Sequence, residues 1–215
     1  MEPSCGDPKF PIWLVADSPP KEWHEQLLAP LDPRHPARHN IWTPILEYTQ
    51  EALYRKKKRR FDTARLYIRN AVTNPDNKPD ARSCDWIEVP QVKVEMDKLQ
   101  TEIEYFKPKI VLTFGAFAFE FLRRTEGKEP LRRFSYWGTK LLGDEFRKSI
   151  KSYDPSGVNI IPLLHVSIAR GKFLESHRYF VGEAGEEPVN YFEYVGKMLA
   201  DLFLQKLDQH PIWMK

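Results

Sequence analysis

The sequence has little cysteine, with only Cys5 and Cys84 among its 215 residues. Two thiols cannot build the disulfide framework of a small secreted domain, and they cannot supply the four thiolates of an iron–sulfur or structural zinc centre. We therefore expect no metal and no cofactor. We also expect a reducing, cytoplasmic setting, where free thiols are the rule.

Long hydrophobic runs are also missing. No apolar stretch approaches the roughly 18 residues that a membrane-spanning helix requires, and residues 1–9 lack the basic and then apolar pattern of a secretory signal. We expect no membrane partner, and no obligate protein partner is evident. No repeat, low-complexity tract or linker divides the chain, so we expect a single domain over residues 1–215.

Charge of one sign is not in large excess. The chain has 33 Lys and Arg against 30 Asp and Glu, a net charge of +3, which does not by itself demand a nucleic-acid partner. Proline, in contrast, is abundant, with 18 residues, many of them between candidate helices and strands. Long proline-marked loops are typical of binding loops carried on a scaffold.

Four short apolar runs have the pattern of buried strands. They are Pro11–Ala16, Arg65–Ile68, Lys109–Phe114 and Asn159–Leu164. Each run leads to a residue suited to chemistry or to a tight turn, and these are Asp17, Asn70, Gly115 and His165. Ligands of open α/β sheets bind outside the carboxyl ends of the strands, so parallel strands would bring these four residues to one edge.

Helical patterns separate the apolar runs. They cover Thr43–Arg60, Val92–Phe106, Ala116–Arg124 and Tyr191–Leu207, whereas Glu126–Pro155 has the pattern of a hairpin or irregular insert. Strands that alternate with helices predict a parallel sheet covered on both faces. We therefore expect an α/β fold, with three layers in the order α/β/α and a four-stranded, mainly parallel sheet.

Two polar residues are candidates for binding or catalysis on the first two strands. A carboxylate at Asp17 can position water or stabilise a cation, but it can also close an Asx turn with nearby backbone N–H groups. Asn70 offers one acceptor and two donors, which suits recognition of a base edge. Asparagine in a buried turn is the alternative.

The last two strands carry the other candidates. Gly115 stands between a strand and a helix, where it can admit a phosphate or merely close a tight connection. His165 can take part in proton transfer or donate to a developing oxyanion, and a purely structural, hydrogen-bonded histidine is the alternative. Ser167, Arg170 and Lys172 follow it as candidate phosphate ligands.

Two further features allow two interpretations each. Trp42 can stack on a base or belong to the core. Six consecutive basic residues, Arg55–Arg60, form either a solvated helix end or a phosphate contact.

Taken in order, these segments resemble the uracil-DNA glycosylase superfamily, most closely its iron–sulfur-type bacterial and archaeal branch. Ala16–Pro20 stands in the place of a Gly-Glu-Ala-Pro-Gly-like turn, and Tyr67–Asn70 in that of a Tyr-Ile-Thr-Asn-like strand. Pro108–Gly115 matches a Pro-Lys-Val-Ile-Leu-Gly-like strand, and His165–Ser167 a His-Pro-Ser-like segment. The glycines of the first motif are absent, Val166 replaces a proline, and the cluster cysteines of that branch are missing.

The resemblance implies a DNA glycosylase that flips uracil or a related deaminated base out of DNA and hydrolyses its N-glycosidic bond. Asp17 and His165 would be catalytic, and Trp42 and Asn70 would hold the base. The phosphates would meet Gly115, Ser167, Arg170 and Lys172, and Ile168–Leu174 would enter the vacated stack. A non-catalytic nucleic-acid or nucleotide-binding module on the same fold is the main alternative, and an interaction protein that binds no nucleic acid is another.

Overall fold

A mostly parallel sheet forms the centre of the molecule. The computed structural model describes residues 1–19, 25–77, 89–169, 174–182 and 190–215. The strands β1 to β5 lie in the order β1-β3-β2-β4-β5, and only β1 is antiparallel to its neighbour. Their bounds are Ser4–Cys5, Ile12–Ala16, Tyr67–Asn70, Ile110–Phe114 and Asn159–Leu163. The predicted α/β fold and its parallel strands are thus confirmed.

The sheet differs from the prediction by one strand. The prediction of four strands missed β1, because a two-residue strand is too short to show a hydrophobic period. It pairs Ser4 with Arg69 and Cys5 with Ile68, and so covers the outer edge of β3. At the opposite edge, β5 contains Pro162, which a parallel sheet tolerates there because its missing N–H would face away from β4.

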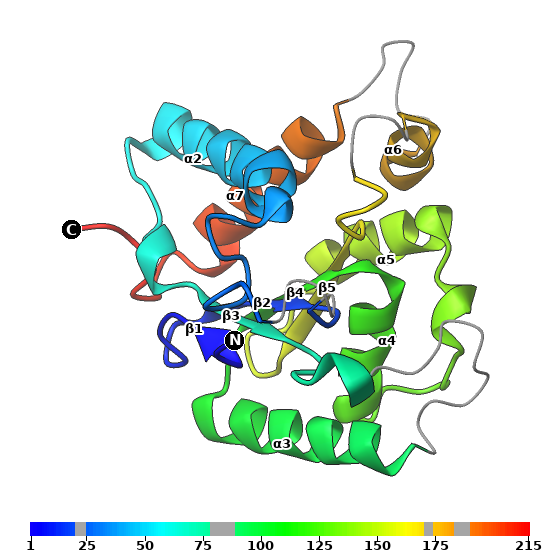
Figure 1. Ribbon diagram of the computed structural model, residues 1–215. Helices are drawn as coiled ribbons and strands as arrows, with labels where there is room; N and C mark the ends of the chain where they lie inside the picture. Colours follow the sequence, from blue (N-terminus) through cyan, green and yellow to red (C-terminus); the bar gives the residue numbers. More distant parts are fainter. Residues whose placement is uncertain (20–24, 78–88, 170–173, 183–189) are drawn as a thin grey trace.

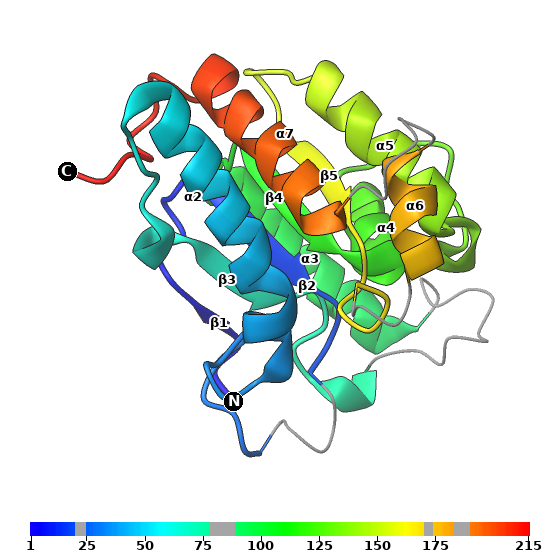
Figure 2. The same cartoon turned by 90° about the horizontal axis from the view of Figure 1, so that it is seen from above.

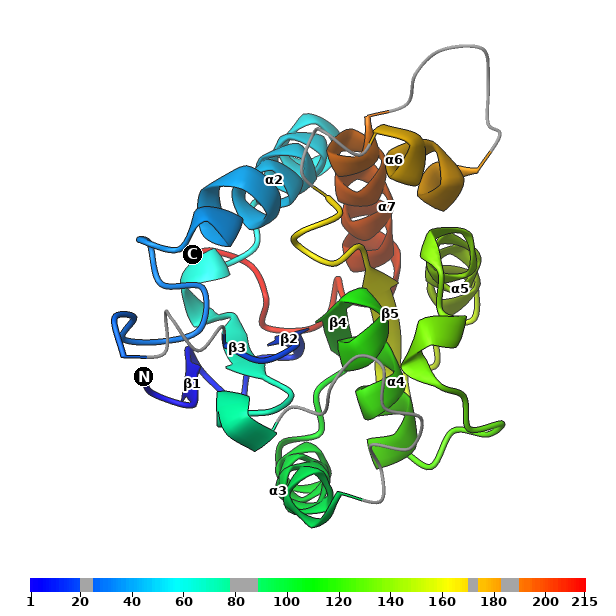
Figure 3. The same cartoon turned by 45° about the vertical axis from the view of Figure 1, so that its right-hand side comes forward.

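Helices cover both faces of this sheet, so the layers are α/β/α as predicted (Figure 1). On one face α2 (Thr43–Lys57) and α7 (Tyr191–Lys206) pack side by side (Figure 2). On the other face lie α3 (Pro90–Phe106) and α4 (Gly115–Thr125), as Figure 3 shows. The apolar side chains of both layers and the sheet meet in one continuous core.

The ends of these helices follow from local chemistry. Pro90 occupies the first turn of α3, where its missing N–H costs nothing, and Lys107 ends the helix in the left-handed conformation with φ 52°. The Asn190 side chain accepts hydrogen bonds from two backbone N–H groups at the start of α7. Shorter helical turns are η1 (Arg38–Trp42), η2 (Thr63–Arg65), η3 (Pro75–Asn77) and η5 (Phe134–Tyr136).

The prediction of a hairpin or irregular insert within Glu126–Pro155 holds only for residues 126–138, which are irregular apart from η5. A well-formed helix, α5 (Thr139–Lys151), occupies most of the remainder and packs on β5. The apolar pair Leu142 and Phe146 has helical spacing, but it is short and follows an irregular stretch, which hid the period. A further helix, α6 (Leu174–Val181), packs against α5 and was not predicted either.

Candidate active site

The carboxyl ends of β2 and β5 bring Asp17 and His165 together. Asp17 directly follows β2, His165 lies two residues beyond β5, and the Asp17 Oδ2 atom is 3.7 Å from His165 Nε2. The Asp17 side chain is 11% exposed and that of His165 is 34% exposed. A largely buried carboxylate thus faces an imidazole that solvent, and hence a ligand, can reach.

This pair lies where the chain reverses its winding. The strands β2 and β4 are neighbours, and the chain leaves β2 towards α2 on one face but leaves β4 directly into α4 on the other (Figure 3). Ligands of open α/β sheets bind at the carboxyl ends of the strands that flank such a topological switch. The residues that the sequence singled out at the ends of β2 and β5 therefore lie together at this edge of the sheet.

The contacts of His165 define which ring nitrogen carries its proton. Its Nδ1 atom lies 3.2 Å from the Ser167 backbone nitrogen and 2.7 Å from the Ser167 hydroxyl. A backbone N–H can only donate, so Nδ1 accepts, and the proton of the neutral ring is on Nε2. The Nε2 atom is also the ring nitrogen that lies nearest the Asp17 carboxylate, at 3.7 Å from Oδ2. Ser167 was predicted to bind phosphate, but in this structure its hydroxyl contacts the histidine.

Gly115 is shaped around the same histidine. It begins α4 with φ 86°, a conformation that favours glycine. A Cβ at this position would lie 2.7 Å from His165 Cβ and 3.0 Å from His165 Cδ2. The glycine therefore lets His165 lie directly against the turn between β4 and α4, in addition to any role in admitting a phosphate.

Two buried aromatic residues hold the segment that carries His165. The Leu164 backbone N–H donates to the Tyr191 hydroxyl at 3.0 Å, and the Ala169 carbonyl accepts from His177 Nε2 at 3.0 Å. The rings of Tyr191 and His177 pack together with their centroids 5.2 Å apart. Burial raises the pKa of Tyr191 and lowers the pKa of His177, and both shifts favour the neutral form of the side chain.

Sequence reasoning missed both of these residues. Tyr191 opens the last helix and His177 lies in α6, far along the chain from the segment that they hold. Only the packing of α6 and α7 against each other places them beside residues 164–169.

Asn70 ends β3 beside the candidate pair. It is 5% exposed, and its strand partner is Ala16, the residue before Asp17. Its backbone carbonyl accepts from Nε of Arg69, whose Nη1 pairs with Glu102 at 2.6 Å. The buried arginine therefore fixes the backbone at the end of the strand, and with it the place from which the Asn70 side chain starts.

The structure places Trp42 in the core, which is one of the two interpretations that the sequence left open. Its side chain is 3% exposed, and its ring meets Phe114 edge-on with centroids 6.1 Å apart. The other predicted phosphate ligands, Arg170 and Lys172, lie outside the described residues. Of the expected wedge, Leu174 is 63% exposed at the start of α6, whereas Ile168 packs against the core.

The basic run lies away from this site. It closes the far end of α2, where Arg55 pairs with Glu51, Lys56 with Asp201 and Arg59 with Asp208. The guanidinium of Arg59 also lies 4.3 Å from the centre of the Trp213 ring. These contacts favour the interpretation of a solvated helix end that is pinned to α7 and the C-terminal segment.

The geometry at the sheet edge agrees with a comparison of the sequence with known families. The Uracil DNA glycosylase superfamily matches residues 35–176, about two thirds of the chain. The chain belongs to the uracil DNA glycosylase superfamily. The matched segment includes Asn70, Gly115 and His165, but it begins after Asp17. No curated protein sequence matches the chain.

The remaining predictions concern metals and membranes. Within the described residues, no group of three or more His, Cys, Asp or Glu side chains is arranged to hold a metal ion. The same part of the chain has no helix with the length and apolar character needed to cross a membrane.

Proposed function

We propose that this member of the superfamily is a DNA glycosylase that excises uracil or a related deaminated base. The observation that carries the proposal is the approach of Asp17 and His165 at the carboxyl edge of the sheet of a uracil DNA glycosylase superfamily domain. Such an enzyme takes the nucleotide out of the stack before it acts. The flipped base then binds at the carboxyl ends of β2 and β4.

The chemistry follows from the two charges that develop as the bond breaks. The sugar carbon gains positive charge, which the Asp17 carboxylate stabilises, and its burial makes that attraction stronger than in water. The same carboxylate orients the water whose oxygen bonds to the sugar carbon. The leaving base gains negative charge on its oxygen, and the N–H on His165 Nε2 donates to that oxygen. One proton of the water finally passes to the base.

We assign recognition of the base to Asn70. Its amide has both donors and an acceptor, it ends the strand beside Asp17, and its backbone is held by Arg69. Gly115 and Ser167 support the position of His165, and they lie close enough to this edge of the sheet to meet the phosphates of the substrate strand. Trp42 was expected to stack on the base. Its ring is enclosed by the core, so this role would require the base to enter the core.

A single-turnover excision assay tests the proposal. Oligonucleotides with one uracil, hypoxanthine or xanthine, each as a single strand and as a duplex, are incubated with excess protein. We expect the release of at least one of these bases. Salt-dependent DNA binding with no release of any of them would overturn the catalytic proposal and favour a nucleic-acid-binding module on the same fold.

A further inference from the structure

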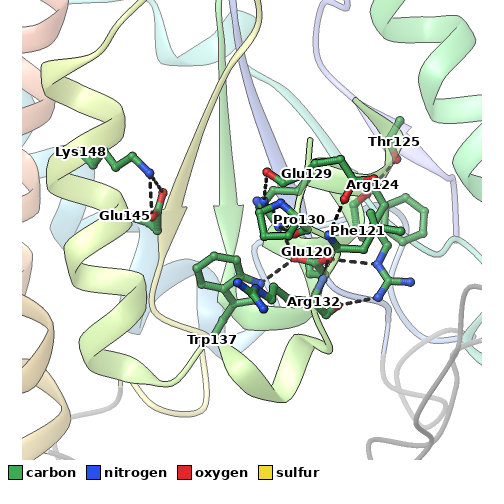
Figure 4. A network of polar contacts seen from close by, with 12 residues as sticks. Glu120, Phe121, Arg124, Thr125, Glu129, Pro130, Arg132, Trp137, Glu145 and Lys148 are labelled. Atoms are coloured by element: carbon green, nitrogen blue, oxygen red, sulfur yellow. Dashed lines mark hydrogen bonds and ion pairs between the residues drawn. The ribbon is translucent and has the colours of Figure 1, made fainter. Parts of the chain in front are cut away.

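A buried carboxylate organises a basic, aromatic surface near the candidate site. Glu120 on α4 is fully buried, and its two oxygens accept from Arg124 Nε, Arg123 Nη1 and Trp137 Nε1. It also accepts from the Arg132 backbone N–H at 2.8 Å (Figure 4). A buried carboxylate with this many donors is fully satisfied, and it fixes the segment around Arg132 against α4.

Two arginines of this region pair with Glu120, and two others lie on the surface. Arg123 and Arg124 both pair with Glu120. Arg132 and Arg133 are exposed, and within the described part of the chain neither forms an ion pair. Residues 130–143 contain no Asp or Glu at all. The surface of this segment therefore carries positive charge that its own residues do not neutralise.

An aromatic ring lies within the same surface. The Arg132 guanidinium lies 4.9 Å from the centre of the Tyr136 ring, and Tyr136 is 46% exposed. Trp137 meets Tyr136 edge-on, with centroids 5.0 Å apart, and is itself anchored to Glu120. The Arg132–Tyr136 pair thus places a guanidinium and an aromatic ring side by side at the surface. Aromatic rings and guanidinium planes are the groups on which unpaired bases stack.

This surface is joined to the candidate site through α4. Phe134, between Arg133 and Tyr136, packs its ring 5.7 Å from that of Phe117. Phe117 is two residues into α4 from Gly115, which touches His165. The basic run of α2 differs in this respect, because α2 starts beside Trp42 and its 15 residues carry its far end about 20 Å away.

We propose that the surface of Arg132, Arg133 and Tyr136 binds a single-stranded stretch of the substrate DNA strand. The two arginines contact phosphates, and an unpaired base stacks on the Arg132–Tyr136 pair. A base can stack there only when it has left the duplex, so the surface selects single-stranded over double-stranded DNA. The inference rests on the proposed function for its substrate, but it concerns binding and not the chemical step.

The chain offers a matched control for the test. At the far end of α2, Lys58 and Arg60 lie 4.9 Å and 5.3 Å from the centre of the Tyr54 ring, and Tyr54 is also 46% exposed. This second cluster also combines two exposed basic residues with a tyrosine of the same exposed fraction, but it lies elsewhere on the molecule. The double variant K58Q/R60Q and the single variant Y54A are therefore compared with R132Q/R133Q and Y136A.

Binding is measured on undamaged oligonucleotides, so no turnover is involved, and over a series of salt concentrations. We expect R132Q/R133Q to weaken single-strand binding about tenfold or more and to flatten its salt dependence by one to two units of slope. We expect Y136A to weaken single-strand binding about tenfold and Y136F to leave it unchanged. We expect R132K to keep the salt slope of the parent but to bind more weakly, because lysine keeps the charge and loses the planar stacking group. The Tyr54 cluster variants should bind like the parent.

The inference is wrong if the Tyr54 cluster variants lose affinity and the Tyr136 surface variants do not. It is also wrong if Y136A binds a base-bearing strand and an abasic strand with the parent's affinities, because no base then stacks on the Arg132–Tyr136 pair. The excision assay is run on the same preparations. If the Tyr136 surface variants lose affinity as expected but the parent protein excises no base, the proposed function is overturned and this inference stands. If the parent excises a base but these variants bind DNA like the parent, this inference is overturned and the proposed function stands.

Discussion

The Cα of Gly115 lies so close to His165 that no side chain fits between them. A Cβ on Gly115 would be 2.7 Å from His165 Cβ, and the φ of 86° at this position is itself unfavourable for any other residue. A strand, a glycine and a helix form a common connection, but here the glycine also sets the position of the candidate catalytic histidine. The turn and the histidine therefore form one structural unit.

Replacing Gly115 with alanine should damage both the turn and the site. We expect G115A to lose about 2 kcal/mol or more of unfolding free energy, from the backbone strain and the overlap with His165 together, and to slow excision. Gly127 is the matched control, because its φ is 61° but a Cβ there would meet nothing within 4 Å. Urea unfolding of G115A and G127A separates strain from overlap. Equal losses in the two variants would contradict the close contact.

Asp17→Asn tests the candidate carboxylate. We expect excision to slow by roughly a hundredfold or more, because the cation stabiliser and the residue that orients water are lost together. The fold should remain, since Asn has the same shape. The exposed Asp97 on α3 provides the control variant D97N. A single-turnover rate for D17N equal to that of D97N would remove Asp17 from the mechanism.

His165→Ala tests whether the imidazole acts on the transition state. A donor to the leaving base matters most when negative charge appears on it, so excision should slow about a hundredfold while DNA affinity falls much less. Rate, affinity and melting temperature are measured on one preparation. A collapse of melting temperature with no separate effect on rate would indicate a structural histidine instead.

Tyr191→Phe tests the support of the catalytic segment. The variant removes the hydroxyl that accepts from the Leu164 N–H and leaves that buried donor without its partner. We expect a loss of about 1–3 kcal/mol in unfolding free energy and a several-fold fall in the excision rate at saturating DNA, with DNA affinity near that of the parent. Tyr153→Phe is a suitable comparison, because the Tyr153 hydroxyl is buried without a partner among the described residues. If both variants behave alike, the hydrogen bond to Leu164 does not matter.

His177 should make the protein less stable in mild acid. Its pKa is lowered by burial in the folded state, so the unfolded chain takes up the proton more readily. Its contribution to stability is therefore complete above the unfolded pKa of about 6.5 and is lost as the pH falls through the lower folded pKa. Burial lowers the pKa of His210 as well, and it adds to the same trend.

The variant His177→Gln separates these two contributions. Glutamine can still donate to the Ala169 carbonyl, but it does not titrate. We expect the dependence of unfolding free energy on pH between about 7 and 5 to become shallower, because a group with a lowered pKa no longer contributes. An unchanged slope in chemical denaturation at several pH values would show that His177 does not titrate in this window.

The sequence by itself determined the parallel strands and the residues that follow them. The four apolar runs became β2 to β5, because buried strands of a parallel sheet need continuous apolar residues. It also determined that Asp17, Asn70, Gly115 and His165 share one edge, because all parallel strands end on the same side. Local pattern failed for β1, α5 and α6, where the apolar period was too short or was interrupted.

Only the tertiary structure decided what these residues touch. The 3.7 Å approach of Asp17 to His165, the space at Gly115 and the hydrogen bond from Leu164 to Tyr191 all join segments that are distant along the chain. Such contacts depend on the order of the strands in the sheet and on how α6 and α7 pack against each other, and no hydrophobic period within one segment encodes that. The same reason explains why, of the two basic clusters compared above, the one at Tyr136 is held by the buried Glu120 and joined to α4.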